Sequence, residues 1–129
     1  MGQAAAAGEA RFALERHIGR IAAARRTSTV LEAVRAYLGS WPSERVERLQ
    51  RADAGWAPFD ERQQPFAFYS AADVENVYRD VHQHCTALRK SGLALSPELL
   101  ELDWVLLLAH LGLQRSRAAQ LHGVGPRAS

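Results

Sequence analysis

Histidines and carboxylates are the residues best suited to metal chemistry, and one group of them lies at positions 80–84. On a helix, His82 and His84 point about 200° apart and cannot share an ion. Asp80 and His84 share one helical face, as do Asp103 and His110. Such pairs line metal sites inside some helical bundles, but the Glu-x-x-His motif of those sites is absent. We therefore predict no metal and no cofactor, with ordinary pairing of polar side chains as the simpler role.

Cys85 is the one candidate thiol nucleophile, and its neighbours argue against catalysis. It shares a helical face with Val81 and Leu88, which predicts a buried and unreactive thiol. The glycines at 123 and 125 are not followed by the Lys and Ser or Thr of a phosphate-binding loop. Neither Gly-x-Ser-x-Gly nor His-Glu-x-x-His occurs. We predict that the chain is not an enzyme and has no catalytic residues.

The charge of the chain is unevenly distributed. Residues 1–51 carry a formal charge of +4, residues 52–111 carry −5, and residues 112–129 carry +3. Arginine suits phosphate contact, although a solvated helix face is the commoner meaning of such charge. One possible function is therefore a small nucleic-acid-associated regulator. It would use the arginines of an N-terminal helix: Arg11, Arg16, Arg20, Arg25 and Arg26.

A helix-turn-helix is a second way in which the chain could contact nucleic acid. Helices expected over 29–38 and 42–53 are separated by a turn of three residues. The second helix would present Arg45 and Arg48, but also two glutamates that would face phosphates unfavourably. Pro42 in the turn is more typical of a plain helical hairpin, so the N-terminal arginines are the better candidates.

Apolar residues at helical spacing predict an all-α fold, a compact bundle of about five helices. No segment alternates with the period of a strand. Thr29 with Glu32, and Ser70 with Asp73, have the spacing of capping boxes at helix starts. The expected helices cover residues 9–26, 29–38, 42–53, 71–90 and 97–113.

The helix expected over 97–113 is apolar on nearly every side. Ser96 is a good N-cap and Pro97 fits the first helical position. Two narrow polar strips interrupt the apolar surface, one carrying Glu98 and Glu101, the other Asp103, His110 and Gln114. Because an all-round apolar helix must be surrounded by other helices, we expect this one to be central. Its large side chains should then be mostly hidden: Leu100, Trp104, Leu107, Leu108 and Leu111.

The segment 54–69 contains five aromatic residues, two prolines and a glycine. We predict an ordered loop that packs across the helices, whose aromatic side chains either complete the core or form a binding patch. Aromatic residues are enriched at the centres of protein interfaces. The predicted interaction residues are therefore Trp56, Phe59, Phe66, Phe68, Tyr69, Trp104 and Leu108.

Composition places these elements in one helical domain over 9–121, between a frayed start at 1–8 and a loose tail at 122–129. Hydrophobic residues make up 47% of the 129 positions, enough for a core. A single cysteine, no apolar leader and no run long enough to span a bilayer predict a cytoplasmic protein. The favoured function is a non-enzymatic protein-interaction or regulatory module, such as an adaptor, an inhibitor or an assembly subunit, which self-associates as a homodimer.

Overall fold

The structure is a computed structural model that describes residues 2–52 and 70–127. It confirms the all-α fold, because the described residues form five helices and no strand. The helices are α1 (Gly2–Ala23), α2 (Thr27–Gly39), α3 (Ser43–Ala52), α4 (Ala71–Lys90) and α5 (Pro97–Arg127).

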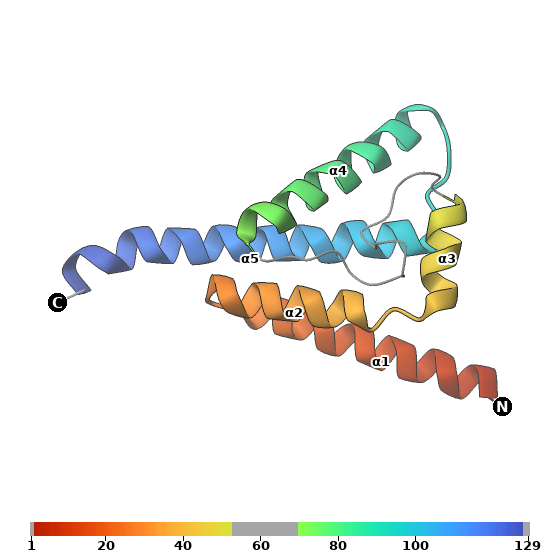
Figure 1. Ribbon diagram of the computed structural model, residues 1–129, viewed down its shortest axis with the longest axis horizontal. Coiled ribbons are helices and arrows are strands. Elements are labelled where there is room, and N and C mark those ends of the chain that lie inside the picture. Colours follow the sequence, from red (N-terminus) through yellow and green to blue (C-terminus); the bar gives the residue numbers. More distant parts are fainter. Residues whose placement is uncertain (1, 53–69, 128–129) are drawn as a thin grey trace.

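The longest helix, α5, runs through the middle of the molecule (Figure 1). The α1–α2 hairpin lies along one side of α5 and α4 lies along the other, while α3 crosses near the start of α5 (Figure 1). All four other helices pack against α5. The central position predicted for this helix is therefore confirmed.

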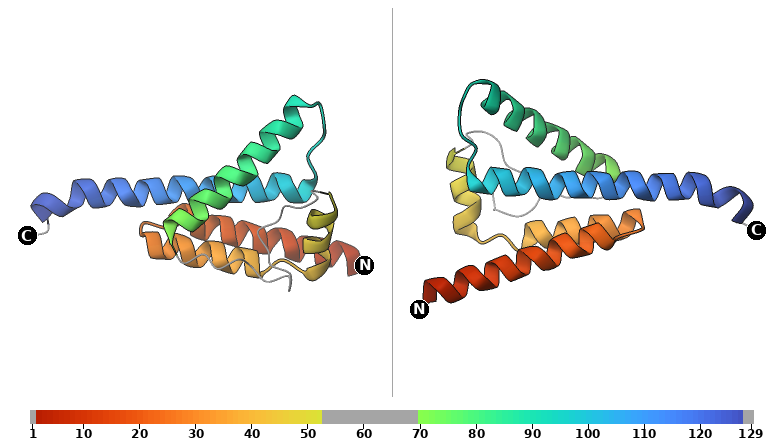
Figure 2. Two further views of the ribbon diagram at one scale, coloured as in Figure 1. Left: turned by 45° about the horizontal axis from the view of Figure 1, so that its top comes forward. Right: turned by 180° about the vertical axis from the view of Figure 1, so that it is seen from behind.

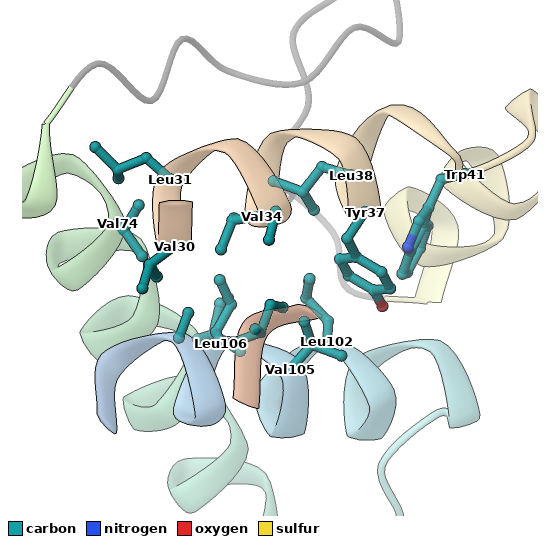
Figure 3. Packing of buried hydrophobic residues seen from close by; sticks show 14 of the residues in the cluster. Val30, Leu31, Val34, Tyr37, Leu38, Trp41, Val74, Leu102, Val105 and Leu106 are labelled. Carbon is teal, nitrogen blue, oxygen red and sulfur yellow. The ribbon is translucent and has the colours of Figure 1, made fainter. Parts of the chain in front are cut away.

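The core lies between α2, α4 and the inner face of α5 (Figure 3). Val30 and Val34 of α2 point toward Val105 and Leu106 of α5, and all four side chains are fully buried. Gly112 of α5 is buried at the same contact, where an added Cβ would come within 3.2 Å of Val30 Cγ2. The absence of a side chain at Gly112 therefore lets α5 approach α2 closely.

The ends of α4 follow the local sequence signals. The Ser70 hydroxyl accepts a hydrogen bond from the Asp73 N–H, and the Asp73 carboxylate accepts one from the Ser70 N–H, so the predicted capping box is confirmed. At the other end, Gly92 has a φ of 73°. The N–H of Leu93 donates to the Leu88 carbonyl and that of Gly92 to Arg89, which is a Schellman motif.

The capping box predicted at Thr29 and Glu32 is wrong. Helix α2 begins at Thr27, after Arg26 in an extended conformation, and no side chain caps its first turn. Thr27 instead pairs its hydroxyl with the hydroxyl of Ser116 at 2.9 Å. That contact fixes the start of α2 against α5, a tertiary interaction that a local pattern cannot show.

Helix α5 is buried on one face rather than all round. Leu100 is 45% exposed, Trp104 49% and Leu111 41%, so the prediction that these three side chains are hidden is wrong. Leu107 and Leu108 are half-buried. The physical reason is that the helices in the described part of the chain pack against the inner residues of α5, which are Leu99, Leu102, Val105, Leu106, Ala109 and Leu113.

The helices at both ends of the chain are longer than expected. Helix α1 starts at Gly2 and α5 continues to Arg127, so both run through segments for which the sequence predicts a frayed start and a loose tail. The alanines at 4–7 have the highest helix propensity of any residue, which favours the early start of α1. Among the described residues, no helix is long and apolar enough to cross a membrane.

Candidate protein-interaction surface

The outer face of α5 carries a row of mostly apolar side chains, which we call the outer seam. Leu100, Trp104, Leu111 and Leu121 are its exposed large residues, and Leu121 is 77% exposed. Half-buried Leu107 lies between Trp104 and Leu111. The complete seam consists of Leu100, Trp104, Leu107, Leu111, Gln114, Ala118 and Leu121.

The spacing of the outer seam is that of a coiled coil. Its members follow one another at alternating intervals of four and three residues from 100 to 121. This heptad spacing keeps a row of side chains on one side of a helix over several turns. At 1.5 Å per residue, the row is about 32 Å long. The outer seam therefore has the length and period of a surface that receives another helix.

The outer seam lies opposite the core. At about 100° per residue, its members centre roughly 180° from the buried residues of the same helix. In the rear view, none of the described helices lies in front of α5 between α4 and α1 (Figure 2). Helix α5 therefore has two apolar faces, of which the helices of the described residues cover one.

A hydrogen-bonded cluster borders the outer seam on the side of α3. The Tyr37 hydroxyl donates to Glu101 Oε2 at 2.6 Å, and Arg45 Nη2 lies 2.8 Å from Glu101 Oε1. Burial and the hydrogen bond to Glu101 raise the pKa of Tyr37 well above its ordinary value. Each carboxylate oxygen thus has a donor, and the cluster holds α2, α3 and α5 together.

Aromatic rings extend this cluster toward α1. Trp41 packs edge-on against Tyr37, with ring centres 6.2 Å apart, and the Arg45 guanidinium lies 4.1 Å above the Trp41 ring. His17 packs edge-on against Tyr37 from the other side at 5.9 Å. Burial, and then Arg20 and Arg16, lower the pKa of His17. Tyr37 is only 2% exposed, so the centre of the cluster is buried.

A stack of rings borders the outer seam on the side of α4. Tyr78 stacks on His110, with ring centres 4.9 Å apart, and on His82 at 5.6 Å. His110 Nδ1 lies 3.2 Å from Glu75, and His82 Nδ1 lies 3.5 Å from Asp103. Burial and the charge of Asp103 raise the pKa of Tyr78. The second polar strip predicted on α5 thus serves to join α5 to α4.

The polar residues considered for metal binding on α5 are directed to separate partners. Asp103 and His110 share a face of α5, but each meets a separate partner on α4, and the two do not converge. Asp80 is exposed on α4. Within residues 2–52 and 70–127, no group of three or more His, Cys, Asp or Glu side chains is placed to hold a metal ion.

The arginines of the nucleic-acid hypothesis lie on α1 and just beyond it. Arg16, Arg20, Arg25 and Arg26 are exposed, whereas the side chain of Arg11 lies outside the part of the chain that is described. Arg25 Nη1 contacts the carbonyls of Ala22 and Ala24 at 3.4 Å, and Arg115 of α5 donates to Ala22 at 3.1 Å. Arg25 thus has a structural role at the C-terminal end of α1, where carbonyls lack helical partners.

Two arginines of α3 pair with glutamates of α5. Arg45 pairs with Glu101, and Arg48 Nε lies 3.5 Å from Glu98 Oε1, so both arginines are directed to α5. Their partners, Glu98 and Glu101, form the first predicted polar strip of α5. The alternative of a helix-turn-helix is not supported by this geometry.

The predicted interaction residues lie in different environments. Trp104 is half-exposed near the N-terminal end of the outer seam, and Leu108 is half-buried and packs beside the core. Sequence reasoning assigned Leu100 and Leu111 to the core, although the four-and-three spacing was a signal that could have marked them. Cys85 is buried, as predicted. The other five lie in 54–69, outside the described residues: Trp56, Phe59, Phe66, Phe68 and Tyr69.

Comparisons with known proteins place no constraint on function. No family model matches the chain, and no curated protein or solved structure is significantly similar to it. The function must therefore be argued from the geometry of α5 and its borders.

Proposed function

We propose that this protein is a non-enzymatic protein-interaction module that binds its partner through the outer seam of α5. The observation that carries the proposal is the exposure of Leu100, Trp104 and Leu111 on the face opposite the core. Single exposed apolar residues are normal on protein surfaces, but a contiguous apolar patch marks an interaction site. In this role the protein acts as an adaptor, an inhibitor or an assembly subunit in the cytoplasm.

The borders of the outer seam support this role. The Tyr37–Glu101–Arg45 cluster on one side and the Tyr78 stack on the other hold α5 in place from both directions. A rigid helix loses little conformational entropy when it binds, so more of the gain from apolar burial appears as affinity. The seam is thus presented as a preformed surface.

A pull-down with matched variants tests the proposal. The tagged chain, a Trp104→Ser variant and a Leu93→Ser control are used as baits in an extract of the native host. Leu93 is 58% exposed and lies before α5, so its replacement removes a similar apolar side chain from outside the seam. We expect a protein partner that is retained by the wild type and by Leu93→Ser and lost from Trp104→Ser. A partner held equally by all three baits overturns the proposal.

A second candidate function is nucleic-acid association through α1 and the turn after it. The observation in its favour is the exposure of Arg16, Arg20 and Arg26. Phosphate-driven binding weakens steeply with salt because counterions are released. Nuclease treatment in the same pull-down, and replacement of these three arginines by Gln, distinguish this function. A complex that survives both changes does not depend on nucleic acid.

A further inference from the structure

We infer that the partner of the outer seam is a second copy of this chain, whose α5 lies antiparallel to the first across a two-fold axis at the level of residues 108–110. This inference rests on the proposed function and adds the identity, direction and register of the partner. It follows from the sizes of the seam residues, from the charge along α5 and from the heptad spacing.

The sizes of the seam residues favour an antiparallel pairing. In this register, Leu107 of one copy meets Leu111 of the other, Trp104 meets Gln114, and Leu100 meets Ala118. In two of these layers a large side chain faces a smaller one, and in the third two leucines meet, so no layer holds two of the largest or two of the smallest side chains. A parallel pairing would set Trp104 against Trp104 and Ala118 against Ala118, leaving one layer overfilled and another underfilled.

The charges along α5 favour the same direction. Residues 97–108 contain three acidic residues and no basic one, whereas residues 109–127 contain three arginines and no acid. An antiparallel pairing places each half opposite the half of opposite sign in the other copy, and a parallel pairing places like charges together. Complementary charge fixes register and suppresses wrong pairings.

Individual flanking residues agree with the register. Beside the seam, Asp103 comes level with Arg117 of the second copy, and Glu101 comes level with Arg115. Within one chain Arg117 Nη2 also lies 2.7 Å from Glu75 Oε1 and Glu101 pairs with Arg45, so these contacts would add to existing ion pairs. Arg115 is exposed and contacts a neutral carbonyl, so its charge is not balanced by that contact. Leu108 meets Leu108 of the second copy at the axis, which extends the apolar contact beyond the seam.

Disulfide trapping tests direction and register together. Leu100→Cys and Ala118→Cys are made as separate chains, one with an added tag that changes its mass, and both positions are exposed. In the antiparallel dimer, residue 100 of one copy lies beside residue 118 of the other. In a parallel dimer these positions are about 27 Å apart along the helix, far beyond the roughly 7 Å between Cα atoms that a disulfide allows.

We expect the oxidised mixture of the two variants to contain the cross-linked heterodimer and neither variant alone to cross-link. The parent chain, whose buried Cys85 is retained in both variants, is the control and should not cross-link. Cross-linking of each variant with itself shows a parallel dimer and overturns the inference. If sedimentation shows a dimer but no cross-link forms at these positions, the inference is also overturned, because the two chains then pair through another face or in another register.

A chain that stays monomeric overturns the inference without deciding the proposed function. In that case a different protein that is lost from the Trp104→Ser bait, but not from the Leu93→Ser bait, still supports the outer seam as an interaction surface. If the chain stays monomeric and no protein is lost selectively from the Trp104→Ser bait, the proposed function and the inference are both overturned.

Discussion

Replacing Trp104 by alanine removes the largest side chain of the outer seam. An aromatic side chain has up to about 250 Å² of surface, and Trp104 is 49% exposed, which leaves about 120 Å² for a partner to cover. At about 25 cal/mol per Å², covering that surface contributes about 3 kcal/mol for each copy, as an upper value. Because the variant dimer lacks both Trp104 side chains, it loses up to about 6 kcal/mol, which weakens the dissociation constant up to about ten-thousandfold, since each 1.4 kcal/mol is tenfold.

The assay is sedimentation equilibrium of the wild type and of Trp104→Ala, which gives the dissociation constant of each dimer. The inner part of Trp104 also contacts its own chain, so the variant loses some folding stability as well. Leu106→Ala is the matched control, because Leu106 is fully buried on the opposite face of the same helix. It should lower the free energy of unfolding by about 2–5 kcal/mol while leaving the dimer of the folded chain intact.

The two variants therefore separate binding from folding. We expect Trp104→Ala to weaken the dimer strongly and Leu106→Ala to destabilise the fold without weakening the dimer. A folded Trp104→Ala chain that associates as tightly as the wild type would refute the assignment of the outer seam as the interface.

Three further predictions concern the fold that presents the outer seam. Tyr37→Phe removes the 2.6 Å hydrogen bond to Glu101 and should lower the free energy of unfolding in urea by about 1.5–3 kcal/mol; an unchanged value would mean that the bond contributes nothing. The pKa of His17 is lowered by burial and by Arg20 and Arg16 from an ordinary 6.5. Since the unfolded chain then takes up the proton first, the contribution of His17 to stability is complete above pH 6.5 and is lost as the pH falls through the folded pKa. The difference between the stability curves of the wild type and His17→Asn should show this loss, and parallel curves would contradict it. Gly112→Val should lower the free energy of unfolding by about 1–3 kcal/mol, because its side chain overfills the contact with Val30. Gly19→Ala, whose added Cβ meets nothing within 4 Å, should raise it by about 0.5–1 kcal/mol. Thermal melts should show a lower melting temperature for the first variant and a higher one for the second.

Local patterns in the sequence predict the start and end of α4 correctly. Ser70 and Asp73 cap its first turn, and Gly92 ends it in a left-handed conformation. These signals depend on residues within four positions of one another, so the sequence contains the whole interaction. The predicted central position of α5 is also correct, because an apolar helix of that length has to bury at least one face.

The sequence did not predict which face of α5 the other helices cover. Apolar residues surround the helix, so composition alone does not say which side the rest of the chain covers. The contact between Tyr37 and Glu101 joins residues 64 positions apart, and the hydroxyl of Thr27, at the start of α2, pairs with that of Ser116 on α5. Such contacts arise from the packing of whole helices, and no local sequence pattern predicts them. The heptad spacing of the outer seam was present in the sequence, but its meaning depends on knowing which face remains uncovered.

The most direct test of the account is the mass of the wild-type chain in solution as its concentration is raised. The chain has a mass of 14.3 kDa. Sedimentation equilibrium should show a concentration-dependent rise to twice that mass, and the rise should be lost or shifted to much higher concentration in Trp104→Ala. A wild-type chain that remains at 14.3 kDa up to millimolar concentration would contradict pairing of α5 with a second copy.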